Sequence, residues 1–239
     1  MNRGAFIVIE GIDGSGTTTQ TALLEKRLTA SGRAVVSTRE PTAGPVGSMI
    51  RQVLTKRLRE PSGAPFNAST MALLFAADRV DHGAVLITPA LASGAVVISD
   101  RYDHSSVGYQ GLTGKLPFAE AAFWLRAINT RAVRPDLVVV VDIDPREAEN
   151  RRRARGGAEE LYEVAALQAH LCTYYSNLSK YFPEDTIVHV DGSRGTDDVG
   201  AAIDRAVQAL FFRQLEQRKA GELEEQLEEL LEDNRAPKP

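Results

Sequence analysis

The residues best suited to chemistry form a glycine-rich segment near the N-terminus. Residues 11–19 read Gly-Ile-Asp-Gly-Ser-Gly-Thr-Thr-Thr and directly follow a short apolar run. Glycines let the backbone turn tightly and bring its N–H groups close to a phosphate, and the N-terminus of a following helix adds partial positive charge. The segment therefore predicts a phosphate-binding loop. The residues expected to contact the phosphates are Gly11, Gly14, Ser15, Gly16, Thr17, Thr18 and Thr19.

One position in this loop departs from the usual pattern. The pattern Gly-x4-Gly-Lys-Ser/Thr places lysine where this sequence has Thr17, so a mobile cation beside the outer phosphates is missing. Thr18 keeps the hydroxyl that such loops direct at Mg²⁺. Two interpretations stay open: an enzyme that obtains this charge from elsewhere, or a non-catalytic protein that only binds a nucleotide.

A second pair of candidate residues lies at the end of an apolar run in the middle of the chain. Residues 96–102 read Val-Val-Ile-Ser-Asp-Arg-Tyr, which is the pattern of a buried strand that ends in an acid and a base. Ligands of open α/β sheets bind at the carboxyl ends of strands. Asp100 can hold Mg²⁺ there together with Thr18, and Arg101 can bind a phosphate through two parallel hydrogen bonds.

Alternating apolar runs and helical patterns must position these residues. The runs are continuously apolar and rich in Val and Ile, as in strands of a parallel sheet that is covered on both faces. Five strands are expected, at Phe6–Glu10, Ala34–Thr38, Ala95–Ser99, Leu137–Ile143 and Thr186–Val190. The helices expected between and after them are Thr17–Ala30, Val46–Arg59, Ser69–Leu91, Phe118–Arg131, Pro145–Arg155, Glu159–Lys180 and Thr196–Arg218. This order predicts the α/β class, a P-loop three-layer αβα fold with a five-stranded parallel sheet.

The end of the chain has a different composition. From about residue 221 it is acidic, and Leu223, Leu227 and Leu230 are spaced as one helical stripe. We expect one domain over residues 1–218, with an extra helical tail and a frayed end over 219–239.

Composition excludes several functional classes. The net charge of −4 gives no overall basic field for nucleic acid, and 43% hydrophobic residues are ordinary for a soluble globular protein. Cys172 is the only cysteine, which rules out an intrachain disulfide and favours a reducing compartment. No apolar stretch is long enough for a membrane span or a signal peptide. We therefore expect a cytoplasmic protein without nucleic-acid or membrane partners.

An arginine-rich stretch follows the fourth expected strand. Residues 150–157 read Asn-Arg-Arg-Arg-Ala-Arg-Gly-Gly, in which Arg151 and Arg155 are spaced to project from one helix face. The stretch suits a mobile lid over about residues 145–160 that closes on a triphosphate, excludes water and supplies positive charge. A solvated basic helix face is the alternative interpretation.

These motifs together resemble the thymidylate kinase family over roughly residues 5–212. Residues 100–110 (Asp-Arg-Tyr-Asp-His-Ser-Ser-Val-Gly-Tyr-Gln) are similar to the family signature Asp-Arg-aromatic-x-x-Ser-x-x-Ala-Tyr-Gln, with Gly108 where alanine is usual. Three further segments resemble the family: the phosphate loop with its acidic residue at 11–16, the segment after the second strand at 38–41, and the nucleobase-binding helix at 74–79.

The resemblance implies a reaction and a set of binding residues. The reaction would be Mg²⁺-dependent transfer of the ATP γ-phosphoryl group to dTMP, giving dTDP for dTTP synthesis, in a homodimer. Phe75 would stack on the base, Arg79 would donate to a thymine carbonyl, and Tyr109 would lie beneath the sugar. The residues expected to bind dTMP are Arg39, Phe75, Arg79, Arg101, Ser106, Tyr109 and Gln110. The catalytic residues would be Asp13, Arg101, Arg151 and Arg155, of which the last two belong to the family's arginine-bearing lid. A kinase of the same fold with another acceptor, such as dUMP or a nucleoside, is the remaining alternative.

Overall fold

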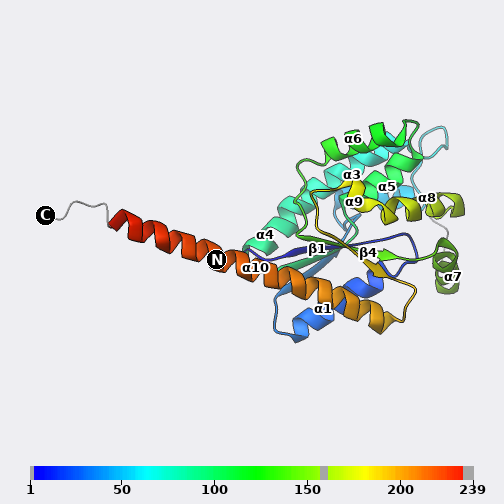
Figure 1. The fold of residues 1–239 in the computed structure, drawn as a ribbon. Coiled ribbons are helices and arrows are strands. Elements are labelled where there is room, and N and C mark those ends of the chain that lie inside the picture. Colours follow the sequence, from blue (N-terminus) through cyan, green and yellow to red (C-terminus); the bar gives the residue numbers. More distant parts are fainter. Residues whose placement is uncertain (1–2, 157–160, 234–239) are drawn as a thin grey trace.

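A computed structural model describes residues 3–156 and 161–233 of the chain (Figure 1). Its centre is a five-stranded sheet in which all neighbouring strands run parallel, in the order β2-β3-β1-β4-β5. The strands are β1 (Phe6–Glu10), β2 (Val35–Arg39), β3 (Val96–Asp100), β4 (Leu137–Asp142) and β5 (Ile187–Asp191). The predicted parallel α/β sheet is confirmed, with four strands shifted by one residue at one or both ends.

Helices cover both faces of this sheet. They are α1 (Thr17–Ala30), α2 (Pro45–Leu54), α3 (Ala68–His82), α4 (Thr88–Ala92), α5 (Asp103–Thr113), α6 (Phe118–Ile128), α7 (Pro145–Arg155), α8 (Ala165–Ser176), α9 (Leu178–Tyr181) and α10 (Thr196–Asp233). Because side chains alternate along a strand, Phe6 and Val8 of β1 pack under α3, α5 and α8, whereas Ile7 and Ile9 pack against α1 and α10. This gives the three layers visible in Figure 1.

The central and edge strands differ in burial. Every residue of β1 and β3 is buried, which explains their continuous apolar runs. Strands β2 and β5 form the two edges, and most of their residues are half-buried or exposed. The expectation that all five strands are covered on both faces is therefore met only in the centre of the sheet.

Several helices are shorter than the sequence pattern predicts. The helix expected over 69–91 is divided, because a π-helical turn over Gly83–Ile87 separates α3 from α4. Pro89 follows this turn and cannot donate the backbone hydrogen bond that a regular helix requires. The helix expected over 159–180 begins at Ala165 among the described residues and breaks at Asn177, and residues 159–160 at its expected start lie outside the described residues.

The last helix is longer than expected. Helix α10 continues past Arg218 to Asp233 and has 38 residues, or about 57 Å at 1.5 Å per residue. Val199, Ile203 and Val207 pack its first part on the sheet, while its second part projects away from the domain (Figure 1). Strong helix formers surround Gly221, and one glycine does not stop a helix of this composition. None of the helices that the structure describes combines the length and apolar composition that a membrane span requires.

Candidate active site

The glycine-rich loop connects β1 to α1 and turns over the N-terminus of that helix. Gly14 and Gly16 have φ angles of 90° and 100°, which residues with side chains rarely adopt. A Cβ atom on Gly14 would also lie 2.3 Å from the carbonyl oxygen of Ala148 in α7. Glycine at position 14 therefore permits both the turn and the close approach of α7.

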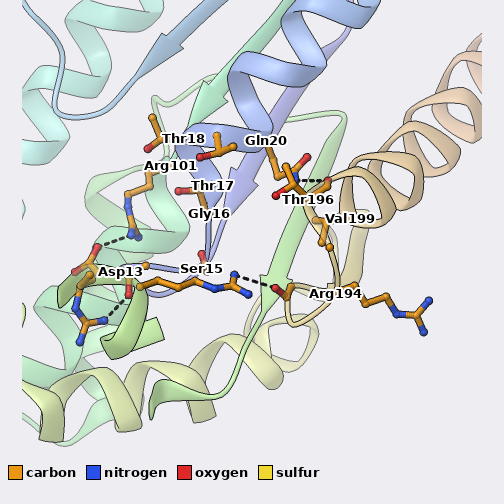
Figure 2. Close-up of a pocket in the computed structure, with 16 residues that line it drawn as sticks. Asp13, Ser15, Gly16, Thr17, Thr18, Gln20, Arg101, Arg194, Thr196 and Val199 are labelled. Carbon is orange, nitrogen blue, oxygen red and sulfur yellow. Dashed lines mark hydrogen bonds and ion pairs between the residues drawn. The ribbon is translucent and has the colours of Figure 1, made fainter. Parts of the chain in front are cut away.

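A hollow of about 550 Å³ opens over this loop (Figure 2). We call it the donor pocket, because the loop is the expected site of the phosphate donor. Residues 13–20 form one side, and another is formed by residues 192, 194 and 195 before α10 and residues 196 and 199 at its start. The first N–H groups of α1 have no helical partners, so this surface suits phosphate oxygens. All of the loop residues expected to contact phosphate line the pocket except Gly11.

The positive charge of the donor pocket comes from arginine. Thr17 is 6% exposed and begins α1, at the position from which a lysine would reach the phosphates. No lysine is among the described residues that line the pocket. Four arginines line it instead: Arg101, Arg151, Arg152 and Arg194. The side chain of Arg194 extends away from the loop in Figure 2.

Helix α7 presents two neighbouring arginines to this pocket. Arg151 donates to the carbonyl oxygen of Gly192 over 3.0 Å and pairs with Glu147, while Arg152 donates to the carbonyl oxygen of Asp13. Arg153 is 75% exposed and pairs with Glu149 on the outer side. Arg152 therefore joins Arg151 at the loop, although sequence spacing favoured Arg155. The side chain of Arg155 lies outside the described residues, as do residues 157–160 of the expected lid.

The expected metal ligands lie next to each other. The hydroxyl of Thr18 donates to Oδ2 of Asp100 over 2.5 Å, and Oδ1 of Asp100 is buried without a protein partner. No group of three or more His, Cys, Asp or Glu side chains in the described part of the chain could hold a metal by itself. Oxygen ligands in this small number fit Mg²⁺, which is usually held by one or two carboxylates together with substrate phosphates.

An ion pair closes one end of the donor pocket. Oδ1 of Asp13 lies 2.6 Å from Nη2 of Arg101, whose Nη1 donates to the carbonyl oxygen of Gly11 over 2.7 Å. Burial disfavours the charged form of Arg101, but nearby Tyr109 and Asp13 outweigh it and hold the pKa of the guanidinium above its usual value. Arg101 is therefore a permanent cation at this point.

A second, smaller hollow lies on the other side of this ion pair, and we call it the acceptor pocket. It encloses about 190 Å³ and shares Asp13 and Arg101 with the donor pocket. Five of the other residues expected to bind the acceptor line it: Phe75, Arg79, Ser106, Tyr109 and Gln110. Arg39 does not, because it is exposed at the end of the edge strand β2. Tyr162 lines the pocket unexpectedly, since it follows the expected lid and belongs to no motif.

The polar atoms of the acceptor pocket include several without a protein partner. They are Nε of Arg79, the hydroxyl of Tyr102 and Oε1 of Gln110, all of which are buried. A buried polar atom without a partner costs free energy, so a ligand that supplies partners would bind favourably. The side chains that carry these atoms line the pocket, but the atoms themselves have almost no exposed surface, so a ligand reaches them only when the side chains turn towards it.

Arg79 is held by other protein groups on its remaining nitrogens. Its side chain is 1% exposed, and Nη2 lies 2.6 Å from Oε2 of Glu40 and 3.1 Å from the hydroxyl of Ser106. Nη1 donates to Oδ1 of Asn129 over 2.6 Å. Sequence reasoning missed Glu40 and Asn129. Glu40 could have been found as the one acid of the Arg-Glu-Pro segment, whereas nothing in the sequence marks Asn129.

Comparison with known proteins identifies the family. The model of the thymidylate kinase family matches residues 9–203. A probable thymidylate kinase of Thermococcus gammatolerans is 43% identical over 192 residues, covering 80% of this chain and 90% of that protein. A thymidylate kinase of Pelobacter propionicus is 36% identical over 207 residues, covering 84% of this chain and 92% of that protein. The chain belongs to the thymidylate kinase family. The resemblance stated from the sequence is thereby confirmed.

The family's signature helix, α5, is anchored at its start by a buried carboxylate. Glu10 accepts hydrogen bonds from the backbone N–H of Tyr102 (2.8 Å), from the hydroxyl of Ser105 (2.7 Å) and from the hydroxyl of Tyr175 (2.9 Å). Burial raises the pKa of Glu10, although these donors and nearby cations oppose the change. Glu10 therefore fixes the helix that carries Ser106, Tyr109 and Gln110 to the end of β1.

A buried histidine anchors the same helix from the other side. Nδ1 of His104 lies 3.2 Å from Asp103, and Nε2 lies 2.8 Å from Asp185, which precedes β5. Arg134 contacts both acids. Burial lowers the pKa of His104, but Asp103 and Asp185 outweigh it and raise the pKa above its usual value. No histidine was expected to matter from the sequence, where all four lack ligand spacing.

This cluster predicts a pH-dependent contribution to stability. Because the pKa of His104 is raised in the folded state, its contribution is complete below the unfolded pKa, about 6.5, and is lost as pH rises through the folded pKa. Below pH 6.5, His104→Gln should lower the free energy of unfolding by about 1.5–3 kcal/mol, the range for hydrogen bonds to charged groups. Urea unfolding of both proteins from pH 6 to 9 measures the difference.

The difference in free energy of unfolding between the original chain and His104→Gln should shrink as pH rises. His170→Gln, at an exposed position on α8, is the matched control and should change little at any pH. A His104→Gln difference that stays constant from pH 6 to 9 would contradict the assignment of a charged, buried imidazole.

Proposed function

We propose that the protein transfers the γ-phosphoryl group of ATP to dTMP, with Mg²⁺, and forms ADP and dTDP. The observation that carries the proposal is the pair of pockets that meet at Asp13 and Arg101. Phosphoryl transfer requires two nucleotides in line and positive charge between them, and little covalent chemistry from the protein. Membership of the thymidylate kinase family supports the same reaction.

The donor pocket supplies the contacts that a triphosphate requires. The loop from Gly14 to Thr19 would bind the phosphates through backbone N–H groups, and Thr18 and Asp100 would hold Mg²⁺. Bound Mg²⁺ neutralises charge on the phosphates as the transferring group moves. Arg101, fixed by Asp13 and Gly11, would place a permanent cation between donor and acceptor phosphates.

The acceptor pocket offers groups that complement a thymine base. Thymine presents carbonyl oxygens and one N–H, so the guanidinium of Arg79 could donate to a carbonyl while the amide oxygen of Gln110, turned towards the base, accepts from the ring N–H. Phe75 provides an aromatic face for the ring. Tyr109 would lie beneath the sugar and disfavour a 2′-hydroxyl, and Arg39 would approach the acceptor phosphate from β2.

The first prediction from the proposed function concerns the acceptor. A coupled assay of ADP release across dTMP, dUMP, dCMP, dGMP and thymidine should give the highest kcat/KM for dTMP. Gln110→Leu should lower kcat/KM for dTMP about fivefold to 150-fold, which corresponds to about 1–3 kcal/mol, because the thymine N–H loses its acceptor. Gln110 suits this test better than Arg79, whose removal would leave Oε2 of the buried Glu40 without its cation and only His82 beside Oε1.

Other acceptors would change the proposal. A higher kcat/KM for dCMP or thymidine would show a related kinase with a different acceptor. Gln208→Leu, at an exposed position on α10, controls for the substitution itself.

We propose further that lid arginines supply the charge that the loop lysine usually carries. A lysine about 4 Å from a phosphate is worth roughly 4 kcal/mol at an effective dielectric constant near 20, which is close to a thousandfold in rate. Arg151 and Arg152 line the donor pocket on the side of α7 that faces the loop. Thr17 keeps a hydroxyl in the loop and leaves the phosphate site open.

The second prediction separates these arginines from the rest of α7. Arg152→Ala should lower kcat at least a hundredfold at saturating ATP and dTMP, because the pocket loses a cation that no lysine replaces. Arg153→Ala removes the same charge from an exposed neighbour and should leave kcat within threefold. If Arg151→Ala, Arg152→Ala and Arg153→Ala each lowered kcat only slightly and to the same extent, the charge would have to come from another group.

We also propose a homodimer through α3, with residues 219–239 outside the catalytic unit. Leu73 and Val80 are seven residues apart on α3, and they are 54% and 47% exposed. Apolar side chains exposed on one helix face indicate a partner surface.

The third prediction tests both parts of this assembly. Light scattering should give twice the 26.0 kDa of one chain, and Leu73→Glu/Val80→Glu should give a monomer. A chain that ends after Arg218 should remain dimeric and active within a few-fold. A monomeric full-length protein would refute the dimer, and a tenfold loss in the folded, shortened chain would place the tail inside the catalytic unit.

A further inference from the structure

Gln168 on α8 contacts the carboxylate that separates the two pockets. Its side chain is 1% exposed. Nε2 donates to Oδ2 of Asp13 over 2.9 Å, and Oε1 accepts from the backbone N–H of Asp13 over 3.1 Å. The second hydrogen of Nε2 goes to the carbonyl oxygen of Tyr162, also over 2.9 Å. Gln168 lies 155 residues from Asp13 in the sequence and belongs to none of the sequence motifs.

This arrangement fixes the orientation of the amide. Both partners of Nε2 are acceptors, a carboxylate and a carbonyl, and the partner of Oε1 is an N–H donor. The opposite orientation of the amide would place oxygen against oxygen and nitrogen against N–H, so only one orientation satisfies all three contacts. Through these two hydrogen bonds, Gln168 holds both the backbone and the carboxylate of Asp13.

Gln168 thereby completes the set of contacts around Asp13. Oδ1 of Asp13 pairs with Arg101, Oδ2 accepts from Gln168, and the carbonyl oxygen accepts from Arg152. Arg152 precedes residues 157–160 and Tyr162 follows them. Arg152, inside the expected lid, is therefore connected to Asp13 directly, and Tyr162, after the lid, is connected to it through Gln168.

We propose that Gln168 is a positioning residue for phosphoryl transfer, which holds the Asp13 carboxylate against Arg101 and fixes Tyr162 at the acceptor pocket. The proposal rests on the kinase reaction proposed above. Gln168 reaches neither pocket itself, since it is absent from the lining of both. It would act by keeping Asp13 and Tyr162 in place, so that the acceptor nucleotide and the cation between the phosphates stay aligned.

The neutral amide is the side chain that suits this position. Leucine has a similar size but donates nothing, so Oδ2 of Asp13 and the Tyr162 carbonyl would lose a buried donor. Glutamate would place a second carboxylate about 3 Å from Asp13, where two like charges cannot both ionise without a large cost. The groups that face this position are Asp13 and, through it, Arg101, together with Tyr109 of α5 and Tyr162.

The experiment measures kcat and KM of Gln168→Leu and Gln168→Glu, with Gln208→Leu and Gln208→Glu as matched controls. Thermal unfolding curves of all variants identify a temperature at which every one of them is folded, and the assays are run at that temperature. Gln168→Leu should lower kcat at least thirtyfold and change KM for ATP less than threefold, because the donor pocket keeps its own residues. The control variants should stay within twofold of the original chain in both constants.

The pH profile of Gln168→Glu distinguishes positioning from a merely structural role. Near pH 8 its kcat should be at least as low as that of Gln168→Leu. It should recover by tenfold or more towards pH 6, since a protonated carboxyl can donate to Asp13 as the amide does. The ratio of kcat of Gln168→Leu to kcat of the original chain should not change between pH 6 and 8.

A double substitution tests whether Gln168 acts through Asp13. In an Asp13→Asn background, adding Gln168→Leu should lower kcat less than threefold further, because the carboxylate that it holds is gone. The proposal is overturned by a folded Gln168→Leu variant with kcat within threefold of the original chain. Additive losses in the double variant, or a pH-independent loss in Gln168→Glu, overturn it as well. An original chain that forms no dTDP would instead refute the proposed function.

Discussion

The contact between Asp13 and Arg101 is the interaction on which the rest of the site depends. The two residues follow neighbouring parallel strands, β1 and β3, whose register pairs Ile9 with Asp100. The Arg101 N–H still donates to the Ile9 carbonyl, and a φ of 73° then turns the chain away from the sheet. Such a conformation costs on the order of 1–3 kcal/mol in a non-glycine residue and is found where a site requires it. Here it directs the guanidinium between the two pockets.

The remaining anchors keep this contact in place from three directions. Glu10 holds the start of α5 behind Arg101, His104 and Arg134 hold that helix against the loop before β5, and Gln168 holds Asp13 from α8. Charge in the site therefore comes from side chains whose positions depend on distant elements. A phosphate loop without lysine is compatible with this arrangement, because Arg101, which follows β3, and two arginines of α7 already line the donor pocket.

Sequence patterns predicted the elements that carry motifs better than the contacts between them. The bounds of β1, α1 and α7 agree with the structure, because each begins or ends at a strong local signal such as the glycine loop or Asp144-Pro145. Helix α5 was absent from the predicted elements, since its polar and glycine-rich sequence has no apolar period. Gln168, Tyr162 and Asn129 could not be predicted, because their roles arise from contacts across the fold. The place of Arg152 at the loop likewise depends on how α7 packs against Gly14, which spacing along the chain does not reveal.

The central claim is that this site transfers a phosphoryl group although Thr17 replaces the usual lysine. The most direct measurement is dTDP formation by the purified chain with saturating ATP, Mg²⁺ and dTMP, beside Thr17→Lys under the same conditions. We expect the original chain to form dTDP. We expect Thr17→Lys to form dTDP as well, but not necessarily faster, because arginines already supply the charge. No dTDP from the original chain, together with clear turnover by Thr17→Lys, would contradict the central claim.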